Sequence, residues 1–280
     1  MVANWARSEC RLRFRSSARS RSMIIEGQAI LSAASRGETG VMGGPMLRAV
    51  IFDFDLTLAD STAGAIDCIN HALQCLGLPN APDRRILESI GLSLPDTFAY
   101  ITGKTDPPMV EAFARHFVAR ADEVMADLTV LFECVPPVVR TLQAAGVAQG
   151  IVSSKFRYRI ERIVAREQLV DCFPVIVGAE DTPYHKPHPA GLLQAMSRLG
   201  CQPDEVVYIG DHPVDAQAAR GAGISFVAVL TGMSERQDFL ENQPPLAIID
   251  NLTGLPQLLG VVRLCEQVMG VPTLSRVGPR

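Results

Sequence analysis

Short runs rich in β-branched residues alternate with helical patterns from residue 47 onward, and this alternation constrains the fold more than any other feature. A strand buried on both faces reads as a continuous apolar run, and helices between such runs cover the faces of a parallel sheet. The expected strands span residues 48–53, 148–153, 174–178, 205–210, 225–230 and 247–250. The expected fold class is therefore α/β, with a parallel, helix-covered sheet.

One interval breaks the alternation, because residues 61–133 hold helical patterns and no convincing strand. The helical patterns span residues 63–75, 82–89, 95–101 and 109–125. Because this interval lies between the first and second strands, it predicts a helical domain inserted into the sheet domain. We expect a core domain formed by residues 46–61 and 134–262, a helical domain at residues 62–133 and a C-terminal tail at residues 263–280.

Residues 1–45 differ in composition from everything that follows. They contain seven Arg and three Glu, and several of the arginines alternate with serines. This composition is typical of a transit peptide, whereas a translation start at Met46, directly before the first strand, is a second explanation. In either case the segment has no sustained apolar period, so we expect a disordered extension outside the fold.

Charge and hydropathy exclude two classes of partner. The whole chain has a net charge of −4, and residues 46–280, with 19 basic and 27 acidic residues, carry −8. An acidic body disfavours nucleic acid as a partner. The longest apolar runs are far shorter than the roughly 20 residues of a membrane span, so we expect no membrane insertion.

Seven cysteines are scattered along the chain without a C-x-x-C pair. This pattern predicts reduced thiols and a reducing compartment. We therefore expect a cytoplasmic protein, or an organellar one if residues 1–45 are a transit peptide. Nothing in the sequence sets an oligomeric state.

Two acids follow the first expected strand, in the order Asp53, Phe54, Asp55. Side chains alternate along an extended chain, so Asp53 and Asp55 emerge on one side and Phe54 points away. Neighbouring carboxylates repel unless one takes up a proton or a cation lies between them, and Mg²⁺ is the usual partner of such oxygens. Acids after a strand also serve as plain turn and helix-capping residues, which is the alternative for this pair.

Polar residues also follow later strands. Ser153 ends the second strand with a hydroxyl that is able to donate to a phosphoryl oxygen or to cap a helix. Lys186 precedes Pro187, which restricts its conformation and is expected to open a helix. Asp211 ends the fourth strand, and Asp215 follows one helical turn later on the same face. Because the carboxyl ends of parallel strands meet at one edge, these groups are expected in one crevice.

As a set, these motifs resemble the haloacid dehalogenase-like superfamily, and within it the branch of phosphoglycolate phosphatases and pyrophosphatases with a helical cap. The resemblance covers residues 47–250 and rests on the motifs at residues 53–57, 153, 186–187 and 210–215. It implies a Rossmann-like three-layer core with a parallel sheet and an inserted α-helical cap domain. It also implies phosphoryl transfer to an aspartate nucleophile.

The resemblance assigns catalytic and metal-binding roles. Asp53 would attack phosphorus and form an aspartyl-phosphate, while Asp55 would protonate the leaving oxygen and then deprotonate the hydrolytic water. Mg²⁺ would be bound by the Asp53 carboxylate, the Asp55 backbone carbonyl and the Asp211 carboxylate.

By the same resemblance, Ser153, Lys186 and Thr57 would bind the phosphoryl group. Asp215 would lie behind the metal ligands and hold either water or Lys186. Thr57 has a second interpretation, in which it only braces the turn. Arg157, with Arg159 two residues later, is interpreted as part of a solvated helix face, with contact to extra anionic charge of a substrate as the alternative.

The implied function is Mg²⁺-dependent hydrolysis of a small phosphorylated metabolite such as phosphoglycolate. Three alternatives stay open: inorganic pyrophosphate as the substrate, a sugar-phosphate mutase of the same fold, and a non-catalytic module that binds a phosphorylated ligand. Dehalogenation is disfavoured, because dehalogenases of this superfamily lack the second acid that Asp55 provides here.

Overall fold

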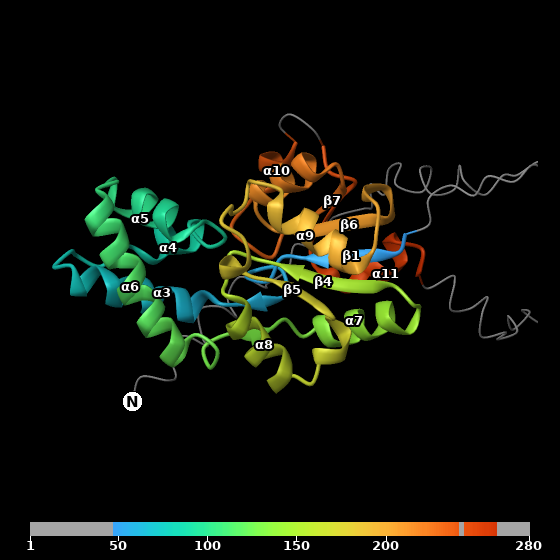
Figure 1. Cartoon of the computed structure of the whole chain (residues 1–280), viewed down its shortest axis with the longest axis horizontal. Coiled ribbons are helices and arrows are strands. Elements are labelled where there is room, and N and C mark those ends of the chain that lie inside the picture. Colours follow the sequence, from blue (N-terminus) through green and yellow to red (C-terminus); the bar gives the residue numbers. More distant parts are fainter. Residues whose placement is uncertain (1–46, 241–243, 262–280) are drawn as a thin grey trace, which may run out of the picture. The chain divides into compact units, whose positions relative to one another are not determined.

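The computed structural model describes residues 47–240 and 244–261. Within them, a parallel sheet has the strand order β5-β4-β1-β6-β7-β8 (Figure 1). Its strands are β1 (Ala49–Phe52), β4 (Ala148–Val152), β5 (Val175–Val177), β6 (Val206–Gly210), β7 (Ser225–Val229) and β8 (Ala247–Ile249). All neighbouring pairs are parallel, so the expected strands and their direction are confirmed. The predictions for residues 1–45 and 263–280 lie outside the described residues.

Helices cover both faces of this sheet, as a three-layer core requires. Val50 and Phe52 of β1 pack into one hydrophobic cluster, whereas Ala49 and Ile51 pack into another on the opposite face. The first cluster holds residues of α7 (Val135–Ala144), α8 (Arg157–Arg166) and α11 (Leu255–Leu258). The second holds residues of α9 (Ala190–Leu199) and α10 (Pro213–Ala222). Burial on both faces explains why the strands read as continuous apolar runs.

Short 3₁₀ helices complete several of the connections. They are η3 (Val170–Cys172), η4 (Ala179–Asp181), η5 (Pro203–Glu205), η6 (Arg236–Phe239) and η7 (Leu252–Gly254).

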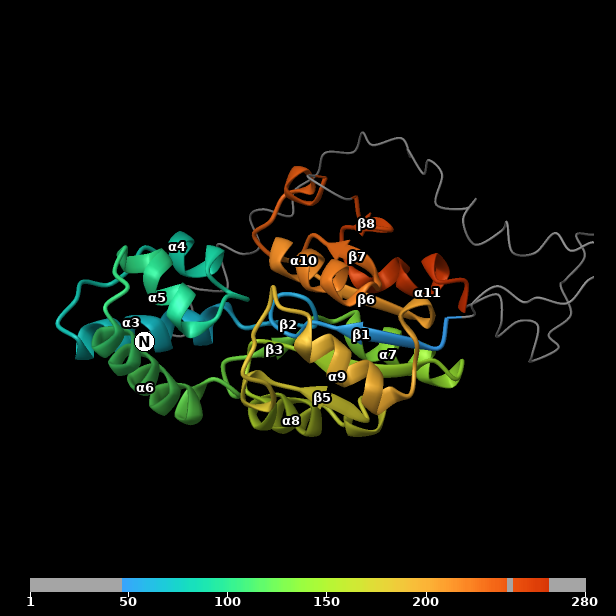
Figure 2. The ribbon, with the colours of Figure 1, turned by 45° about the horizontal axis from the view of Figure 1, so that its top comes forward.

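A helical domain is inserted between β1 and β4 (Figures 1 and 2). It consists of α3 (Thr62–Cys75), α4 (Asp83–Glu88), α5 (Leu94–Thr102) and α6 (Pro107–Val124). The starts of α5 and α6 follow from local chemistry, because Ser93 and Asp106 each accept a hydrogen bond from a backbone N–H three residues later. A separate hydrophobic cluster that includes Phe98 and Phe113 holds the insertion together. The helical insertion expected from residues 61–133 is therefore confirmed.

The expectation that residues 61–133 contain no strand is wrong. Strand β3 (Val130–Leu131) pairs in antiparallel fashion with β2 (Ala59–Asp60), and Figure 2 shows this ribbon between the inserted helices and β1. Two-residue strands are too short to produce a visible alternation in the sequence. Ala59 and Leu131 pack into a cluster of the sheet domain. The exact borders of the cap domain stay a prediction.

The expectation that Pro187 opens a helix is also wrong. Helix α9 begins at Ala190, with Pro189 at the position before its first turn. The Lys186–Pro187 peptide bond is cis, and both residues lie in the loop that leads to α9. Lys186 therefore comes from a loop rather than from a helix start. Gly200 and Gly223 end α9 and α10 in the left-handed conformation that favours glycine.

Among residues 47–240 and 244–261, no helix has both the length and the apolar character that a membrane span requires. Five cysteines fall in this part of the chain, and all are free thiols: Cys68, Cys75, Cys134, Cys172 and Cys201. The expectation of reduced thiols stays a prediction, and Cys10 and Cys265 lie outside the described residues.

Candidate active site

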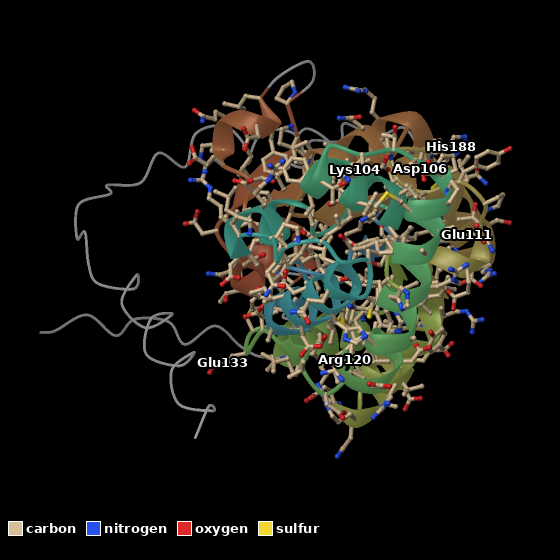
Figure 3. All side chains as sticks on the ribbon, turned by 90° about the vertical axis from the view of Figure 1, so that its left-hand side faces the viewer. Lys104, Asp106, Glu111, Arg120, Glu133 and His188 are labelled. Carbon is tan, nitrogen blue, oxygen red and sulfur yellow. The ribbon has the colours of Figure 1, made fainter. Side chains whose placement is uncertain are left out.

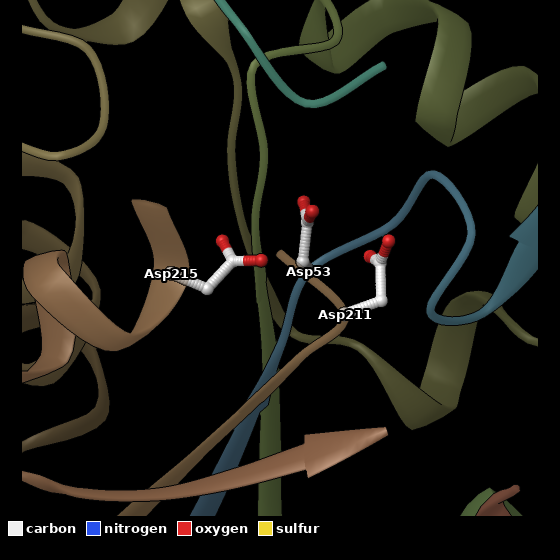
Figure 4. Close-up of side chains that lie close together, drawn as sticks. All are labelled: Asp53, Asp211 and Asp215. Atoms are coloured by element: carbon white, nitrogen blue, oxygen red, sulfur yellow. The ribbon is translucent and has the colours of Figure 1, made fainter. Parts of the chain in front are cut away.

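Three aspartates converge at the carboxyl ends of β1 and β6 (Figure 4). Asp53 follows β1, Asp211 follows β6, and Asp215 lies in the first turn of α10. The two strands are neighbours in parallel register, with Phe52 opposite Ile209, so Asp53 lies one position and Asp211 two positions beyond this pair. One carboxylate oxygen of each aspartate lies within 4.8 Å of the others, and all three side chains are buried. The structure thus brings together three acids that the sequence predicted in one crevice.

Asp215 is held in place by both of its carboxylate oxygens. The backbone N–H of His212 donates to Oδ2 at 3.1 Å, and the Tyr208 hydroxyl donates to Oδ1 at 3.0 Å. Lys186 Nζ also donates to Oδ1, at 2.6 Å. The predicted contact between Asp215 and Lys186 is present. Tyr208, which the sequence analysis did not single out, reaches the site from inside β6.

Lys186 bridges two of the three acids. Its Nζ lies 2.9 Å from Asp53 Oδ2 as well as 2.6 Å from Asp215 Oδ1, and its side chain is 5% exposed. Burial alone lowers the pKa of the Lys186 ammonium, but Asp215 and Asp53 outweigh it and raise the pKa above its ordinary value. Lys186 therefore carries a fixed positive charge beside Asp53.

The acids of this cluster carry more negative charge than Lys186 balances. Burial, the largest cause, raises the pKa of Asp53 from 3.8 to about 6, with Lys186 opposing the rise and Asp215 adding to it. Burial, followed by the charges of Asp215 and Asp53, also raises the pKa of Asp211 well above its ordinary value. Both shifts therefore arise chiefly from burial, and the repulsion between the neighbouring carboxylates adds to them.

The donor set fits a hard divalent cation. Asp53 Oδ1 is buried and has no hydrogen-bond partner among the described residues, although a buried carboxylate oxygen normally has one. Clustered carboxylate oxygens are the ligands that Mg²⁺ prefers. The Asp55 carboxylate does not belong to this cluster. The metal contact predicted for Asp55 is made by its backbone carbonyl only.

Asp211 is braced by the loop that follows β1. The Thr57 hydroxyl donates to Asp211 Oδ1 at 2.8 Å, and both residues are buried. A hydroxyl has one proton, so in this arrangement Thr57 holds Asp211 and does not donate to a ligand. The predicted contact between Thr57 and a phosphoryl group stays a prediction. On its other side Asp211 packs so tightly against Gly232 that a Cβ on Gly232 would lie 2.0 Å from Asp211 Oδ2.

Asp55 has a different set of neighbours from Asp53. Its Oδ1 lies 3.0 Å from Nζ of Lys155, a lysine to which the sequence analysis gave no role. This contact is an ion pair by distance, but Oδ1 has no hydrogen-bond partner, so the ammonium is not aligned with it. The site therefore contains two acid–lysine pairs, Asp53 with Lys186 and Asp55 with Lys155.

Ser153 and Ser154 follow β4 and have separate roles. Ser153 is buried, and its hydroxyl oxygen accepts from the backbone N–H of Lys155 at 3.3 Å. No acceptor for the Ser153 hydroxyl proton is present in the part of the chain that the structure describes. The Ser154 hydroxyl donates to the carbonyl of Gly91 in the helical insertion at 2.9 Å. Ser153 is thus the hydroxyl that stays available to a ligand.

The interpretation of Arg159 as part of a solvated helix face is wrong. Its side chain is 5% exposed and pairs with Asp122 of α6 at 2.6 Å. It also donates to the carbonyl of Val118, so it ties α8 to the inserted helices. Arg157 is more exposed and pairs with Asp181 and Glu161. Sequence spacing on α8 could not reveal Asp122, which lies 37 positions away.

Acids, a hydroxyl and lysines at the carboxyl ends of parallel strands, beneath a helical insertion, define a capped α/β enzyme with an aspartate-centred site. The sequence profile described as haloacid dehalogenase-like hydrolase matches residues 50–229. The chain belongs to this family, as the motifs in its sequence implied. It is a hydrolase homologous to phosphatases.

Named relatives give the degree of similarity. A phosphoglycolate phosphatase from Xanthomonas campestris pv. campestris strain 8004 is 31% identical over 206 residues, covering 71% of this chain and 93% of that protein. Pyrophosphatase PpaX from Bacillus cereus strain AH820 is 29% identical over 214 residues, covering 76% and 96%. The crystal structure of a haloacid dehalogenase-like protein from Bacteroides fragilis has a TM-score of 0.72 and 39% identity, covering 75% of this chain and 99% of that one.

Proposed function

We propose that this phosphohydrolase is a Mg²⁺-dependent phosphatase that cleaves a small phosphate ester of the phosphoglycolate type through an aspartyl-phosphate on Asp53. The observation that carries the proposal is Asp53 Oδ1. This buried oxygen has no hydrogen-bond partner among the described residues, and the Lys186 ammonium lies beside its twin oxygen, Oδ2, at 2.9 Å. An ionised carboxylate is a nucleophile that needs no separate base.

In the first step a carboxylate oxygen of Asp53 attacks phosphorus and forms a new P–O bond. The bond between phosphorus and the ester oxygen breaks, and its electron pair stays on the leaving oxygen. Asp55, protonated at the start, donates its proton to that oxygen. Asp55 is suited to this role because it is only two residues from Asp53 and lines the space beneath the cap.

In the second step Asp55, now ionised, removes a proton from a water molecule. The water oxygen attacks phosphorus, and the P–O bond to Asp53 breaks. Inorganic phosphate leaves, the Asp53 carboxylate is restored, and Asp55 has regained its proton. Both half-reactions balance without any further acid or base.

The charge on the transferring phosphoryl group is met by Lys186 and by the hydroxyl of Ser153. Asp215 and Tyr208 keep Lys186 oriented. Lys186 Nζ donates to Asp215 Oδ1 and to the Tyr208 hydroxyl, and this hydroxyl donates to the same Asp215 oxygen. The Asp53 and Asp211 carboxylates and the Asp55 backbone carbonyl would bind Mg²⁺. When bound, Mg²⁺ supplies positive charge that offsets the clustered carboxylates and the phosphoryl oxygens.

The substrate is proposed to be small because the cavity next to Asp55 has a volume of about 80 Å³. Its walls come from the core and from residues 89–92 and 94 of the insertion, so the cap covers the Asp55 side of the site. The name of the relative in Xanthomonas campestris favours phosphoglycolate. The name of the relative in Bacillus cereus keeps inorganic pyrophosphate as the second candidate.

Phosphate release by the purified full-length chain tests this proposal. The substrates are phosphoglycolate, pyrophosphate and glucose 1-phosphate, each with Mg²⁺ and with EDTA. We expect Mg²⁺-dependent release that prefers phosphoglycolate and is lost in Asp53→Asn, a variant of nearly the same shape. If Asp53→Asn were as active as the unaltered chain, Asp53 would not be the nucleophile. If activity in EDTA equalled activity with Mg²⁺, the reaction would not depend on the metal. Isomerisation of glucose 1-phosphate without phosphate release would identify a mutase instead.

A further inference from the structure

Lys155 lies at the boundary between the core and the inserted helices. It follows β4 by three residues, and its side chain is 5% exposed. Lys155 lines the cavity of about 80 Å³ together with Asp55, Ser154, Gly91 and Leu92. The cavity lies on the Asp55 side of the site, whereas Lys186 lies on the Asp53 side. Lys155 is therefore a second buried lysine, beside the acid that would serve the leaving group.

Arg159 is the other cationic side chain that lines the cavity, and its guanidinium already has partners outside it. Among the residues that line it, the charged ones are Asp55, Lys155 and Arg159. Arg159 forms an ion pair with Asp122 and a hydrogen bond to the carbonyl of Val118. Its guanidinium thus contributes to cap docking, whereas the ammonium of Lys155 contacts Asp55 inside the cavity.

Lys155 Nζ lacks an aligned acceptor. Asp55 Oδ1 is 3.0 Å away, yet this oxygen has no hydrogen-bond partner, and no other acceptor for Nζ occurs in residues 47–240 and 244–261. An ammonium without hydrogen-bonded acceptors keeps its donors available to an anionic group. Because Lys155 lines the cavity, a part of the substrate has room to supply the acceptor.

We propose that Lys155 binds a carboxylate on the leaving group and so selects phosphate esters of small hydroxy acids. This inference rests on the proposed function, in which Asp55 protonates the leaving oxygen. A carboxylate joined to that oxygen through one methylene carbon would lie next to Asp55, and Lys155 Nζ is 3.0 Å from Asp55 Oδ1. The leaving end of such a substrate therefore reaches the side chains of both Asp55 and Lys155.

The charge count favours a carboxylate over a second phosphoryl group. While Asp55 carries the proton that the first step of the proposed reaction requires, the ammonium of Lys155 adds one positive charge to the cavity, and a carboxylate supplies the one negative charge that matches it. The leaving group of pyrophosphate carries more negative charge and three oxygens, and the remaining polar wall groups are neutral hydroxyls of Ser61, Ser89, Thr97 and Ser154. An ammonium that pairs with a carboxylate forms a charge-assisted hydrogen bond of the stronger kind.

The test compares phosphoglycolate with 2-hydroxyethyl phosphate, which has the same length but a hydroxymethyl group in place of the carboxylate. Lys155→Met keeps the length of the side chain and removes its charge. We expect the ratio of kcat/KM for phosphoglycolate to kcat/KM for 2-hydroxyethyl phosphate to fall about 100-fold, as the loss of a hydrogen bond to a charged group predicts. Lys155→Arg, which restores a cation, should recover part of the preference.

Lys104→Met is the matched control, because Lys104 is an exposed lysine on the cap (Figure 3). It should leave the preference for phosphoglycolate unchanged. Equal losses on both substrates in Lys155→Met would overturn the inference, and so would a selective loss on pyrophosphate. If the unaltered chain hydrolyses none of these esters, the proposed function fails.

Measurements of ligand binding test the proposed role of Lys155 independently of turnover. In the Asp53→Asn background, calorimetry with phosphoglycolate and 2-hydroxyethyl phosphate measures the two affinities without hydrolysis. Tighter binding of phosphoglycolate that disappears when Lys155→Met is added supports the proposal. Equal affinities, or a preference that survives Lys155→Met, overturn it.

Discussion

The Thr57 hydroxyl donates a hydrogen bond of 2.8 Å to Asp211 Oδ1, although 154 positions separate the two residues. The bond joins the loop after β1 to the end of β6, and both residues are buried. It fixes the orientation of a carboxylate that would bind the metal. Loss of a group that orients a metal ligand in this way typically lowers metal affinity about 10- to 100-fold.

Replacing Thr57 by Val should weaken Mg²⁺ binding and leave the fold intact. Val has nearly the same shape but cannot donate, so Asp211 loses the hydrogen bond that orients it. We expect the Mg²⁺ concentration for half-maximal phosphate release to rise about 10- to 100-fold. A Mg²⁺ titration of activity measures this, with Thr57→Ser, which keeps the hydroxyl, as the control. An unchanged Mg²⁺ requirement in Thr57→Val would show that the bond has no role in metal binding.

Gly232→Ala should also impair the metal site, but by steric pressure. An Ala Cβ would lie 2.0 Å from Asp211 Oδ2 and 2.9 Å from its Cγ, so Asp211 would have to move. Because Thr57 holds the other oxygen, such a shift breaks the orientation of the carboxylate. We expect Mg²⁺-dependent activity to fall at least about tenfold, which corresponds to about 1.4 kcal/mol. Gly254→Ala is the control, since an added Cβ meets nothing within 4 Å there. Similar activities of the two variants would disprove the steric argument.

Mg²⁺ affinity should fall as the pH decreases through about 6. The pKa of Asp53 is raised to about 6, chiefly by burial, and that of Asp211 is raised well above its ordinary value. At low pH the metal must displace protons from these carboxylates, so binding releases protons and weakens as they become scarcer. We expect Mg²⁺ to raise Tm more at pH 7.5 than at pH 5.5. Thermal unfolding with Mg²⁺, against NaCl of equal ionic strength, measures the effect. The same shift at both pH values would argue against a carboxylate site.

Much of the fold could be predicted because its strands are buried on both faces. The apolar runs of β1, β4 and β6 carry that information locally, and glycines such as Gly200 mark the helix ends. Two features escaped the same reasoning. Strand β3 has only two residues and depends on its partner β2, and the start of α9 depends on how the loop after Pro187 packs.

The candidate site could be predicted in part, and the reason is geometric. Asp53, Ser153, Lys186 and Asp211 follow strands or their connecting loops, and parallel topology brings such positions together. Lys155 also follows a strand, but its significance depends on Asp55 and on the cavity beneath the cap, which are tertiary properties. Tyr208 and Gly232 matter through contacts with Asp215 and Asp211 that no spacing in the sequence reveals.

Removing the Lys186 charge should destabilise the protein more at neutral pH than at acidic pH. Lys186→Met leaves Asp53 and Asp215 buried without their cation, which costs roughly 3–5 kcal/mol. An acid whose pKa is higher in the folded than in the unfolded state binds more protons when folded, so its unfavourable contribution grows as pH rises through that pKa. The pKa of Asp53 is already about 6 beside Lys186, because burial raises it, and loss of the ammonium raises it further.

We therefore expect the stability deficit of Lys186→Met in EDTA to be smaller at pH 5 than at pH 7.5. Urea unfolding of the variant and the unaltered chain at both pH values measures the difference. Lys104→Met controls for the loss of an exposed positive charge and should show a small deficit at both. A Lys186→Met deficit that is equal or larger at pH 5 would mean that Asp53 and Asp215 do not depend on this lysine for charge compensation. A deficit that shrinks with acidity would mean instead that the lysine compensates the charge of the buried carboxylates beside it.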